Sequence, residues 1–427
     1  MGIVVYIIFF LFSLLLVKNY RLAVFTLSGW CLLFQEVKFP GTPFSLFDLL
    51  AIESLVFFFA KMKKNKRHDE KYPFVWATIL VVCSLLVTNY FGIIKHWPYT
   101  IVFSIANYIF PILLWYALKT KEDIVTFTKV SVSFFFVLTL YGIVEVSLGY
   151  NPLLRWMIST NAFASNIIDS DRFRFGFKRI QSFMVMNGAL GVSCSLFFLF
   201  LFYLKNETAF ISKKTSIKHF ALLVALLLLN ILFTGTRSCY VTFVVASLYF
   251  VSINNLKSKR FYGICLLLLI IVIFNENLLA SIWGSFTDTE SVSGSNTDMR
   301  ANQFDTALYF MNRNFMFGNG ANYTYEYVAA NFHQDILGAE SIWLPLMIDQ
   351  GIFGVVTYAL FILYCLLYCV KARSKAGFFL TLSFIVAKTM TSVSGMNKAY
   401  FLIYLLVMLR AEAIEGKTQK TILYGKN

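Results

Sequence analysis

Arg237 is the single charged residue in a mostly apolar run of 34 residues, Phe220 to Ile253, where it lies in the polar break Thr234-Gly235-Thr236-Arg237. A guanidinium at the centre of a membrane-spanning helix costs roughly 2.5 to 3.5 kcal/mol on insertion scales. The run therefore indicates two helices that meet at a turn presenting Arg237. Such an arginine is a candidate for anion binding through paired hydrogen bonds; the alternative is an ordinary loop arginine.

A second group of cations lies in the segment from Leu148 to Phe183, where five basic residues stand against only Asp169 and Asp171. Guanidinium groups bind phosphate through charge-assisted, bidentate hydrogen bonds. The excess predicts a site for a lipid-linked phosphate or pyrophosphate; the alternative is that these side chains reach toward lipid headgroups. The five residues are Arg155, Arg172, Arg174, Lys178 and Arg179.

The polar segment from Trp283 to about Glu340 carries the remaining candidates, beginning with Arg300. Its Gly318-Asn319-Gly320 stretch is either an anion-binding nest or a plain turn, and the plain turn is favoured. Glu340 is either a general base for a sugar hydroxyl or a helix-terminal carboxylate favoured by the helix dipole. His333 has a pKa range suited to proton transfer but ranks below Glu340, because a lone histidine in a polar loop is usually solvated.

The composition identifies the class of protein that must position these residues. Hydrophobic residues make up 58% of the chain and charged residues 14%, and the mean hydropathy is +0.69. These values exclude a soluble domain of this length and predict an all-α polytopic membrane protein. The formal charge of +15 reflects membrane orientation rather than nucleic-acid binding, because no basic domain stands apart from the apolar runs.

Two kinds of centre are not expected. The seven cysteines all fall in apolar segments, where they behave as small hydrophobes, so neither a disulfide framework nor a metal site is predicted. A Gly-rich phosphate loop, a nucleotide-binding domain and an internal repeat are also missing from the sequence, which argues against ATP-driven chemistry.

Apolar stretches long enough to cross a hydrocarbon core of roughly 30 Å predict about thirteen spans, with twelve as the alternative count. Lysine and arginine clusters in alternate short connections face the cytoplasm, which places the N-terminus outside. The first run, Ile3 to Val17, lacks a cleavage site and is read as a retained helix. The spans fall near 3–17, 20–36, 45–60, 74–91, 99–118, 128–147, 184–204, 218–234, 238–253, 261–282, 341–369, 376–390 and 398–414.

This topology divides the chain into five parts, with two large extracytoplasmic loops. The loops occupy residues 148–183 and 283–340, and long loops in compact proteins usually carry function. Between and around them lie the N-terminal helices (1–147), a middle set that includes the Thr234–Arg237 outer turn (184–282), and the C-terminal helices with a short cytoplasmic tail (341–427).

Taken in order, these motifs resemble the bacterial O-antigen polymerase and O-antigen ligase superfamily, the Wzy-type membrane glycosyltransferases, over roughly Arg172 to Arg410. Thr234-Gly235-Thr236-Arg237 looks like the family's T-G-S/T-R turn. The other matching pieces are Ser182-Phe183-Met184-Val185-Met186-Asn187-Gly188, Arg300 followed by Asn314 to Gly320, Glu340-Ser341-Ile342-Trp343-Leu344, and Gly351-Ile352-Phe353-Gly354.

The resemblance implies a GT-C-like glycosyltransferase of the bacterial inner membrane that acts on its outer face without metal or cofactor. Its substrate would be an oligosaccharide linked to undecaprenyl pyrophosphate, and a chain-length regulator would be a possible partner. Ligases of the family usually carry His-Asn or His-Ser where this chain has Glu340-Ser341, and His333 lies seven residues early. This departure favours a polymerase, for O-antigen, capsule or exopolysaccharide.

In that scheme Arg237 and Arg300 bind the leaving pyrophosphate, Glu340 activates the acceptor hydroxyl, and Arg179 binds the second carrier. The predicted substrate contacts are Arg172, Arg174, Arg179, Asn187, Gly318, Gly320, His333 and Ser341. Two alternatives remain. One is a ligase that transfers glycan to lipid A core. The other is a flippase of lipid-linked sugar, for which Glu145 and Lys388 are too few charges along the helices to form a pathway.

Overall fold

The computed structural model describes residues 2–33, 37–42, 44–62, 71–159, 173–174, 177–184, 186–207, 220–250, 297–328, 341–391 and 396–416. Twelve of the thirteen predicted runs are helical in this part of the chain, and the run 261–282 lies outside it. These helices are α1 (Gly2–Lys18), α2 (Tyr20–Leu33), α3 (Leu46–Met62), α4 (Val75–Phe91), α5 (Trp97–Ser104) continued by η1 (Ile105–Ile109) and α6 (Phe110–Ala117), α7 (Lys121–Leu148), α9 (Asn187–Glu207), α11 (Phe220–Phe233), α12 (Arg237–Ser247) with η2 (Leu248–Phe250), α16 (Trp343–Lys371), α17 (Lys375–Met390) and α18 (Met396–Ile414).

The protein is a helical membrane protein. Four of the described helical segments are long and apolar enough to cross a bilayer: Trp97–Ala117, Lys121–Leu148, Asn187–Asn206 and Trp343–Lys371. Shorter apolar helices accompany them, among them Phe220–Phe233 and Arg237–Phe250 on either side of the predicted turn. Large apolar side chains such as Ile3 and Trp76 are each 76% exposed, an exposure suited to contact with lipid rather than water.

Local sequence explains where several helices begin. Helix α7 starts at Lys121, seven residues before its predicted start, because Thr120 and Asp123 form a capping box that satisfies backbone N–H groups of the first turn. Ser374 caps α17 by accepting a hydrogen bond from the Gly377 N–H. The π-helical turn η1 directly precedes α6, in which Pro111 cannot donate a backbone hydrogen bond.

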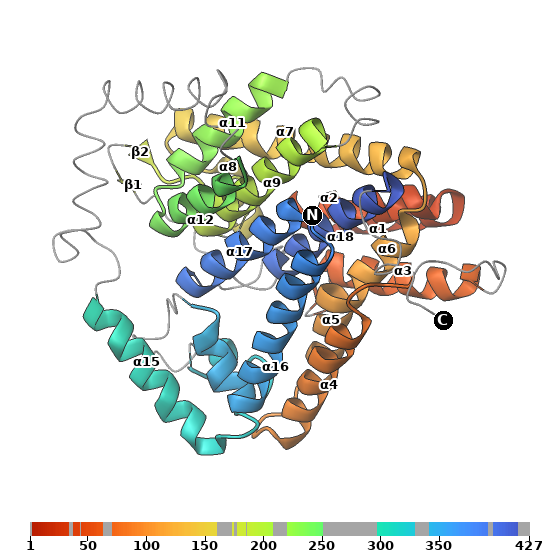
Figure 1. Cartoon of the computed structure of the whole chain (residues 1–427). Helices are drawn as coiled ribbons and strands as arrows, with labels where there is room; N and C mark the ends of the chain where they lie inside the picture. Colours follow the sequence, from red (N-terminus) through yellow and green to blue (C-terminus); the bar gives the residue numbers. More distant parts are fainter. Residues whose placement is uncertain are drawn as a thin grey trace.

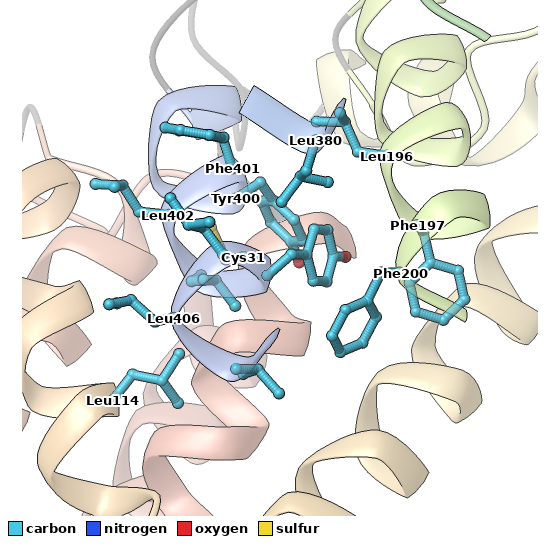
Figure 2. Close-up of a cluster of buried hydrophobic side chains, with 14 of the residues drawn as sticks. Cys31, Leu114, Leu196, Phe197, Phe200, Leu380, Tyr400, Phe401, Leu402 and Leu406 are labelled. Carbon is cyan, nitrogen blue, oxygen red and sulfur yellow. The ribbon is translucent and has the colours of Figure 1, made fainter. Parts of the chain in front are cut away.

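The core is built around α18 and α9. Every residue of α18 from Tyr400 to Ala411 is buried, as are most residues of α9. Figure 2 shows where these helices meet α17: Leu196, Phe197 and Phe200 lie beside Leu380, Tyr400 and Phe401. The rings of Phe384 and Phe401 stack with centroids 4.5 Å apart. Because α18 is enclosed by protein, its neighbours α9 and α17 are held in fixed positions relative to each other.

The segments predicted as outer loops contain regular structure that the sequence did not predict. The first contains α8 (Pro152–Ser159) and a short antiparallel hairpin of β1 (Phe173–Arg174) and β2 (Phe177–Lys178). The second contains α15 (Thr297–Met311), η3 (Asn312–Asn314) and η4 (Thr324–Val328). The all-α prediction therefore needs a small correction, since two short strands pair within the described residues.

One end of the bundle carries both of these segments, and we call it the loop face. Figure 1 shows the hairpin β1–β2 and α15 on the same side of the molecule. Backbone hydrogen bonds join the segments to helix ends: the Ile180 N–H donates to the Phe233 carbonyl, and the Ile94 N–H donates to the Asn319 carbonyl. Lysine-rich connections lie at the other end of the bundle. They include Lys119 between α6 and α7, Lys205 at the end of α9, and Lys371 at the end of α16.

Candidate functional site on the loop face

The polar break around Arg237 is a turn between two helices, as predicted. Helix α11 ends at Phe233 and α12 begins at Arg237. Within the turn, the Thr234 N–H donates to the Asn230 carbonyl and the Gly235 N–H donates to the Leu232 carbonyl. Arg237 is half-buried at the first position of α12. A cation there faces the positive end of the helix dipole, which disfavours it unless an anion is also present.

Arg179 supports this turn directly. Its Nε donates to the Thr234 carbonyl at 3.0 Å, and its Nη2 donates to the Thr236 hydroxyl at 2.9 Å. Thr236 is the N-cap residue of α12, and its side chain makes no capping hydrogen bond. Since at least two of the five guanidinium N–H groups of Arg179 hold the turn, the geometry favours a positioning role over the predicted contact with a second carrier.

A buried ion pair fixes the segment that carries Arg179. Glu145 of α7 and Lys178 of β2 are both 0% exposed, with Nζ and Oε1 3.4 Å apart. The Glu145 carboxylate also accepts hydrogen bonds from the backbone N–H groups of Gln181 and Ser182, at 3.1 and 2.6 Å. Glu145 was not a predicted site residue, whereas Lys178 was one of the five cations predicted to bind phosphate and here pairs with a carboxylate. A carboxylate near the end of an apolar helix was nevertheless a usable signal, because such a group needs a cationic partner.

Asn187 completes the support of the same segment. It is the first residue of α9, is 8% exposed, and its side-chain amide donates to the Ile180 carbonyl at 3.0 Å. One residue further along α9, the Gly188 carbonyl accepts a hydrogen bond from the Cys239 thiol of α12. The predicted substrate contact of Asn187 remains a prediction, and the observed contact is with the backbone that follows Arg179.

The Gly318-Asn319-Gly320 stretch is a structural turn that packs into a break in α16. Gly351 of α16 has a φ of +61°, so the helix is interrupted there. The N–H groups of Asn319 and Gly320 donate to the carbonyls of Ile348 and Asp349, both at 2.9 Å. These N–H groups are engaged within the chain, which agrees with the favoured turn and leaves little basis for an anion nest.

The same loop also provides hydrogen-bond partners for the backbone of α16 that follows the break at Gly351. The N–H groups of Ile352 and Phe353 donate to the carbonyls of Phe315 and Met316, at 3.0 and 3.1 Å. A β-carbon at Gly318 would collide with the backbone of Asp349 and Gln350. The glycines of both motifs therefore permit a close backbone approach, and the motifs named separately in the sequence form one unit.

Arg300 lies on α15, which is attached to this unit. Its side chain is exposed. Two turns further along the helix, Ala307 and Phe310 pack in a small cluster with Leu344 and Ile348 of α16. The cluster fixes α15 against α16 and leaves Arg300 on the loop face.

A contact between an imidazole and a carboxylate ties the segment that follows α15 to the rest of the loop face. His96 Nε2 and Glu326 Oε2 lie 2.9 Å apart and join η4 to the connection between α4 and α5. Arg313 Nη1 donates to the Tyr323 hydroxyl at 3.3 Å. Burial raises the pKa of the Tyr323 phenol.

The remaining predicted site residues are described in part. Ser341 is half-buried just before α16, and its hydroxyl accepts a 3.4 Å hydrogen bond from the Trp343 N–H. Arg174 lies on β1, and its side chain is outside the described residues, as are Arg172, His333 and Glu340 as a whole. Among the residues that the structure does describe, no three His, Cys, Asp or Glu side chains gather as a metal site.

Residues 222–359 match the family model described as O-antigen ligase, Wzy_C. The match runs from α11 through the Arg237 turn, α15 and the Gly318–Gly320 turn to the break in α16. The chain thus carries the domain that O-antigen ligases and Wzy polymerases share. No curated protein matches the chain. Members of the Wzy_C family are membrane enzymes that transfer glycosyl groups.

The match supports an activity of ligase or polymerase type on lipid-linked glycans. It includes in full all four motifs that lie downstream of the first loop. Residues 172–188, with Arg179 and Asn187, precede it.

Proposed function

We propose that this protein is a polymerase of lipid-linked oligosaccharide repeat units, made for O-antigen, capsule or exopolysaccharide. The observation that carries the proposal is the placement of Arg237. It lies within the Wzy_C domain, at the first position of α12, in a turn held by the donors of Arg179. Lysine-rich connections at the opposite ends of the helices support an extracytoplasmic loop face.

The proposed reaction is a glycosyl transfer between two lipid-linked substrates. The hydroxyl oxygen of the incoming repeat unit attacks the anomeric carbon of the growing glycan, and a new C–O bond forms. The bond between that carbon and the pyrophosphate oxygen breaks, and its electron pair leaves with undecaprenyl pyrophosphate. Arg237 and Arg300 stabilise the charge that develops on the pyrophosphate. Glu340 takes the proton of the attacking hydroxyl.

The supporting residues receive secondary roles in this scheme. Arg179 positions the turn that presents Arg237, in place of the expected grip on a second carrier. Arg172, Arg174, Asn187, His333 and Ser341 are retained as proposed substrate contacts at the edge of the site. Gly318 and Gly320 act through the shape of the loop that carries α15.

The second candidate function is an O-antigen ligase, which is the activity that gives the matching family its description. The two activities share the arginine features and differ in the acceptor. The resemblance associates ligases with a histidine at the position where this chain has Glu340. That departure supports a polymerase, which extends one lipid-linked glycan with another.

The test is a reconstituted assay with purified, full-length protein, its lipid-linked repeat unit and no nucleotide, with products resolved by size. A ladder at repeat-unit spacing is expected. Arg237→Ala and Arg300→Ala should each lower chain extension by about 10²- to 10³-fold, the loss typical when a transition-state donor is removed. Arg373→Ala, which removes an exposed arginine in the connection between α16 and α17, is the matched control and should extend chains normally.

The outcomes separate the candidates. Transfer that occurs only after lipid A core is added would identify a ligase. If neither product forms and lipid-linked sugar instead moves across the vesicle membrane, the protein would be a transporter. Near-normal chain lengths in both Arg237→Ala and Arg300→Ala would refute the assignment of these residues even if polymerisation occurs.

A further inference from the structure

Four side chains near the end of α15 and in η4 form a surface cluster that the proposed reaction does not use. We call it the tyrosine cluster, and it consists of Tyr309, Arg313, Tyr323 and Tyr327. Helix α15 runs along the edge of the molecule (Figure 1). Tyr309 is 60% exposed and Tyr327 is 45% exposed, and Arg313 is exposed as well. The cluster therefore presents two aromatic rings and a guanidinium at the surface of the loop face.

The polar groups around these rings place the cluster in water rather than in lipid. Glu326, the neighbour of Tyr327, is exposed, and its Oε2 lies 2.9 Å from His96 Nε2. The Asn322 side-chain amide donates to Glu326 Oε1 at 2.7 Å. Charged side chains are costly in contact with hydrocarbon, and Arg313 and Glu326 would both be exposed to it. The rings beside them therefore face water, where uncovered aromatic surface marks a binding site.

Contacts within the cluster fix the orientation of its rings. The rings of Tyr323 and Tyr327 stack with centroids 4.8 Å apart and an angle of 28° between their planes. Arg313 Nη1 donates to the Tyr323 hydroxyl at 3.3 Å, and the guanidinium carbon lies 5.4 Å from the centroid of the Tyr309 ring. Arg313 thus joins the ring on α15 to the two rings of η4.

The backbone under the cluster is anchored to α16. The N–H and the hydroxyl of Thr324 both donate to the Asp349 carboxylate, at 2.7 and 2.6 Å. Thr324 and Asp349 are buried. Side chains held on such a support lose little freedom when they bind a ligand.

The cluster lies on the other side of α15 from Arg300. Tyr309 follows Arg300 by nine residues, which is about 14 Å along the helix and about two and a half turns around it. Ala307, which packs against α16, is about two turns from Arg300 and so shares its side of the helix. A ligand group held by Tyr309 is therefore remote from the pyrophosphate that Arg300 is proposed to bind.

We propose that the tyrosine cluster is a second glycan-binding site, which holds sugars of the growing chain that lie remote from its reacting end. This inference rests on the proposed function. The C–H groups on one face of a sugar ring pack against an aromatic ring, and the sugar hydroxyls require both donors and acceptors. Tyrosine offers a rigid ring with a hydroxyl, Arg313 offers donors and Glu326 offers acceptors. A glycan held there stays with the enzyme between additions, which favours long products.

The experiment measures the binding of glycan that carries no lipid. The probe is the surface polysaccharide of the source cells, released by mild acid and separated by length. Full-length protein in nanodiscs is titrated with each fraction, and binding is followed by saturation-transfer NMR. Tyr309→Ala and Tyr327→Ala each remove a ring, and Tyr309→Phe keeps one. Tyr6→Ala, which removes a 51% exposed tyrosine of α1, is the matched control, and thermal melting reports whether each variant is folded.

The expected result is a roughly fivefold weaker affinity for the glycan in Tyr309→Ala and in Tyr327→Ala, the size of one aromatic contact. Tyr309→Phe and Tyr6→Ala should bind like the parent protein. In the reconstituted polymerisation assay, the product ladder of Tyr309→Ala should shift to shorter chains.

The inference is overturned if folded Tyr309→Ala and Tyr327→Ala both bind the glycan like the parent protein. If these two variants also melt earlier than the parent in nanodiscs but not in detergent, the rings belong to the membrane interface instead. A parent protein that makes the ladder but binds no lipid-free glycan refutes this inference alone. Glycan binding that depends on the rings, with no ladder formed, refutes the polymerase alone.

Discussion

Removing one member of the buried Glu145–Lys178 pair should destabilise the protein strongly. Both side chains are 0% exposed, and the carboxylate also holds the N–H groups of Gln181 and Ser182. Breaking a buried pair leaves an uncompensated charge and costs about 3–5 kcal/mol. Lys178→Met and Glu145→Gln should each lower the free energy of unfolding by that amount. The double variant should cost less than the sum, because no buried charge is left without its partner.

The free energy of unfolding can be measured by titrating the purified protein from dodecyl maltoside into SDS micelles. Arg21→Met is the matched control, because the Arg21 side chain in the ion pair with Asp123 is 44% exposed. The Asp123 side chain is 11% exposed and keeps its hydrogen bonds to Thr120 without Arg21. This variant should therefore lose no more than about 1 kcal/mol, the upper range for a pair with one side open to water.

The assay also links stability to the site. Because the pair anchors the segment that carries Arg179, chain extension should fall in folded preparations of either single variant. The reasoning is refuted if Lys178→Met and Glu145→Gln both unfold within about 1 kcal/mol of the parent protein, the range of an exposed pair.

Two further predictions concern the supports of the site. Gly351→Ala should cost about 2–4 kcal/mol of unfolding free energy, because its β-carbon would lie 2.6 Å from the Gly318 nitrogen and the Phe315 oxygen at a φ of +61°. The control is Gly149→Ala, because Gly149 has a φ of +74° and a β-carbon there would meet nothing within 4 Å; it should cost only about 1 kcal/mol. Equal costs for the two variants in a detergent unfolding titration would contradict the close packing of the Gly318 loop against Gly351. Arg179→Lys should lower chain extension by about tenfold or more with normal abundance, since an ammonium cannot reproduce the fork to Thr234 and Thr236. Arg373→Lys is its control, and an unchanged product ladder for Arg179→Lys would show that the turn between α11 and α12 holds without the two Arg179 hydrogen bonds.

Hydropathy predicted the helices well because a bilayer leaves few alternatives for an apolar chain. Twelve of the predicted runs are helical in the described residues, since each backbone group in lipid must be paired within its own segment. The start of α7 was wrong by seven residues, although the Thr120 and Asp123 capping box is visible in the sequence. Residues Lys121 to Asp123 are charged, so the hydropathy pattern placed the start of the helix at the apolar run 128–147 and not at Lys121.

The candidate site was harder to predict because its supports depend on pairings across the chain. Glu145 and Lys178 are 33 residues apart, and nothing in their neighbours along the sequence specifies that they meet. Arg179 illustrates the consequence. Its residue type suggested a phosphate ligand, yet its donors bind the backbone and side chain of the turn that presents Arg237. Residue type predicts which chemistry is available, but only the fold decides how the donors are used.

The break in α16 explains why motifs far apart in the sequence depend on each other. A helix interrupted at Gly351 exposes carbonyls and N–H groups that would each cost several kcal/mol if left unpaired in hydrocarbon. The loop from Phe315 to Gly320 pairs with them on both sides of the break. The break and the loop must therefore form together.

This dependence has a consequence for the proposed reaction. Helix α15 directly precedes the loop and packs on α16, and the Ile342 N–H at the start of α16 donates to the Lys388 carbonyl. The position of α15, which carries Arg300, relative to α17 is therefore fixed by core packing and backbone hydrogen bonds. Helix α17 in turn packs along α12, which begins at Arg237. A transfer between two membrane-anchored lipids requires such a framework, because charge stabilisation by fixed groups needs no rearrangement during the reaction.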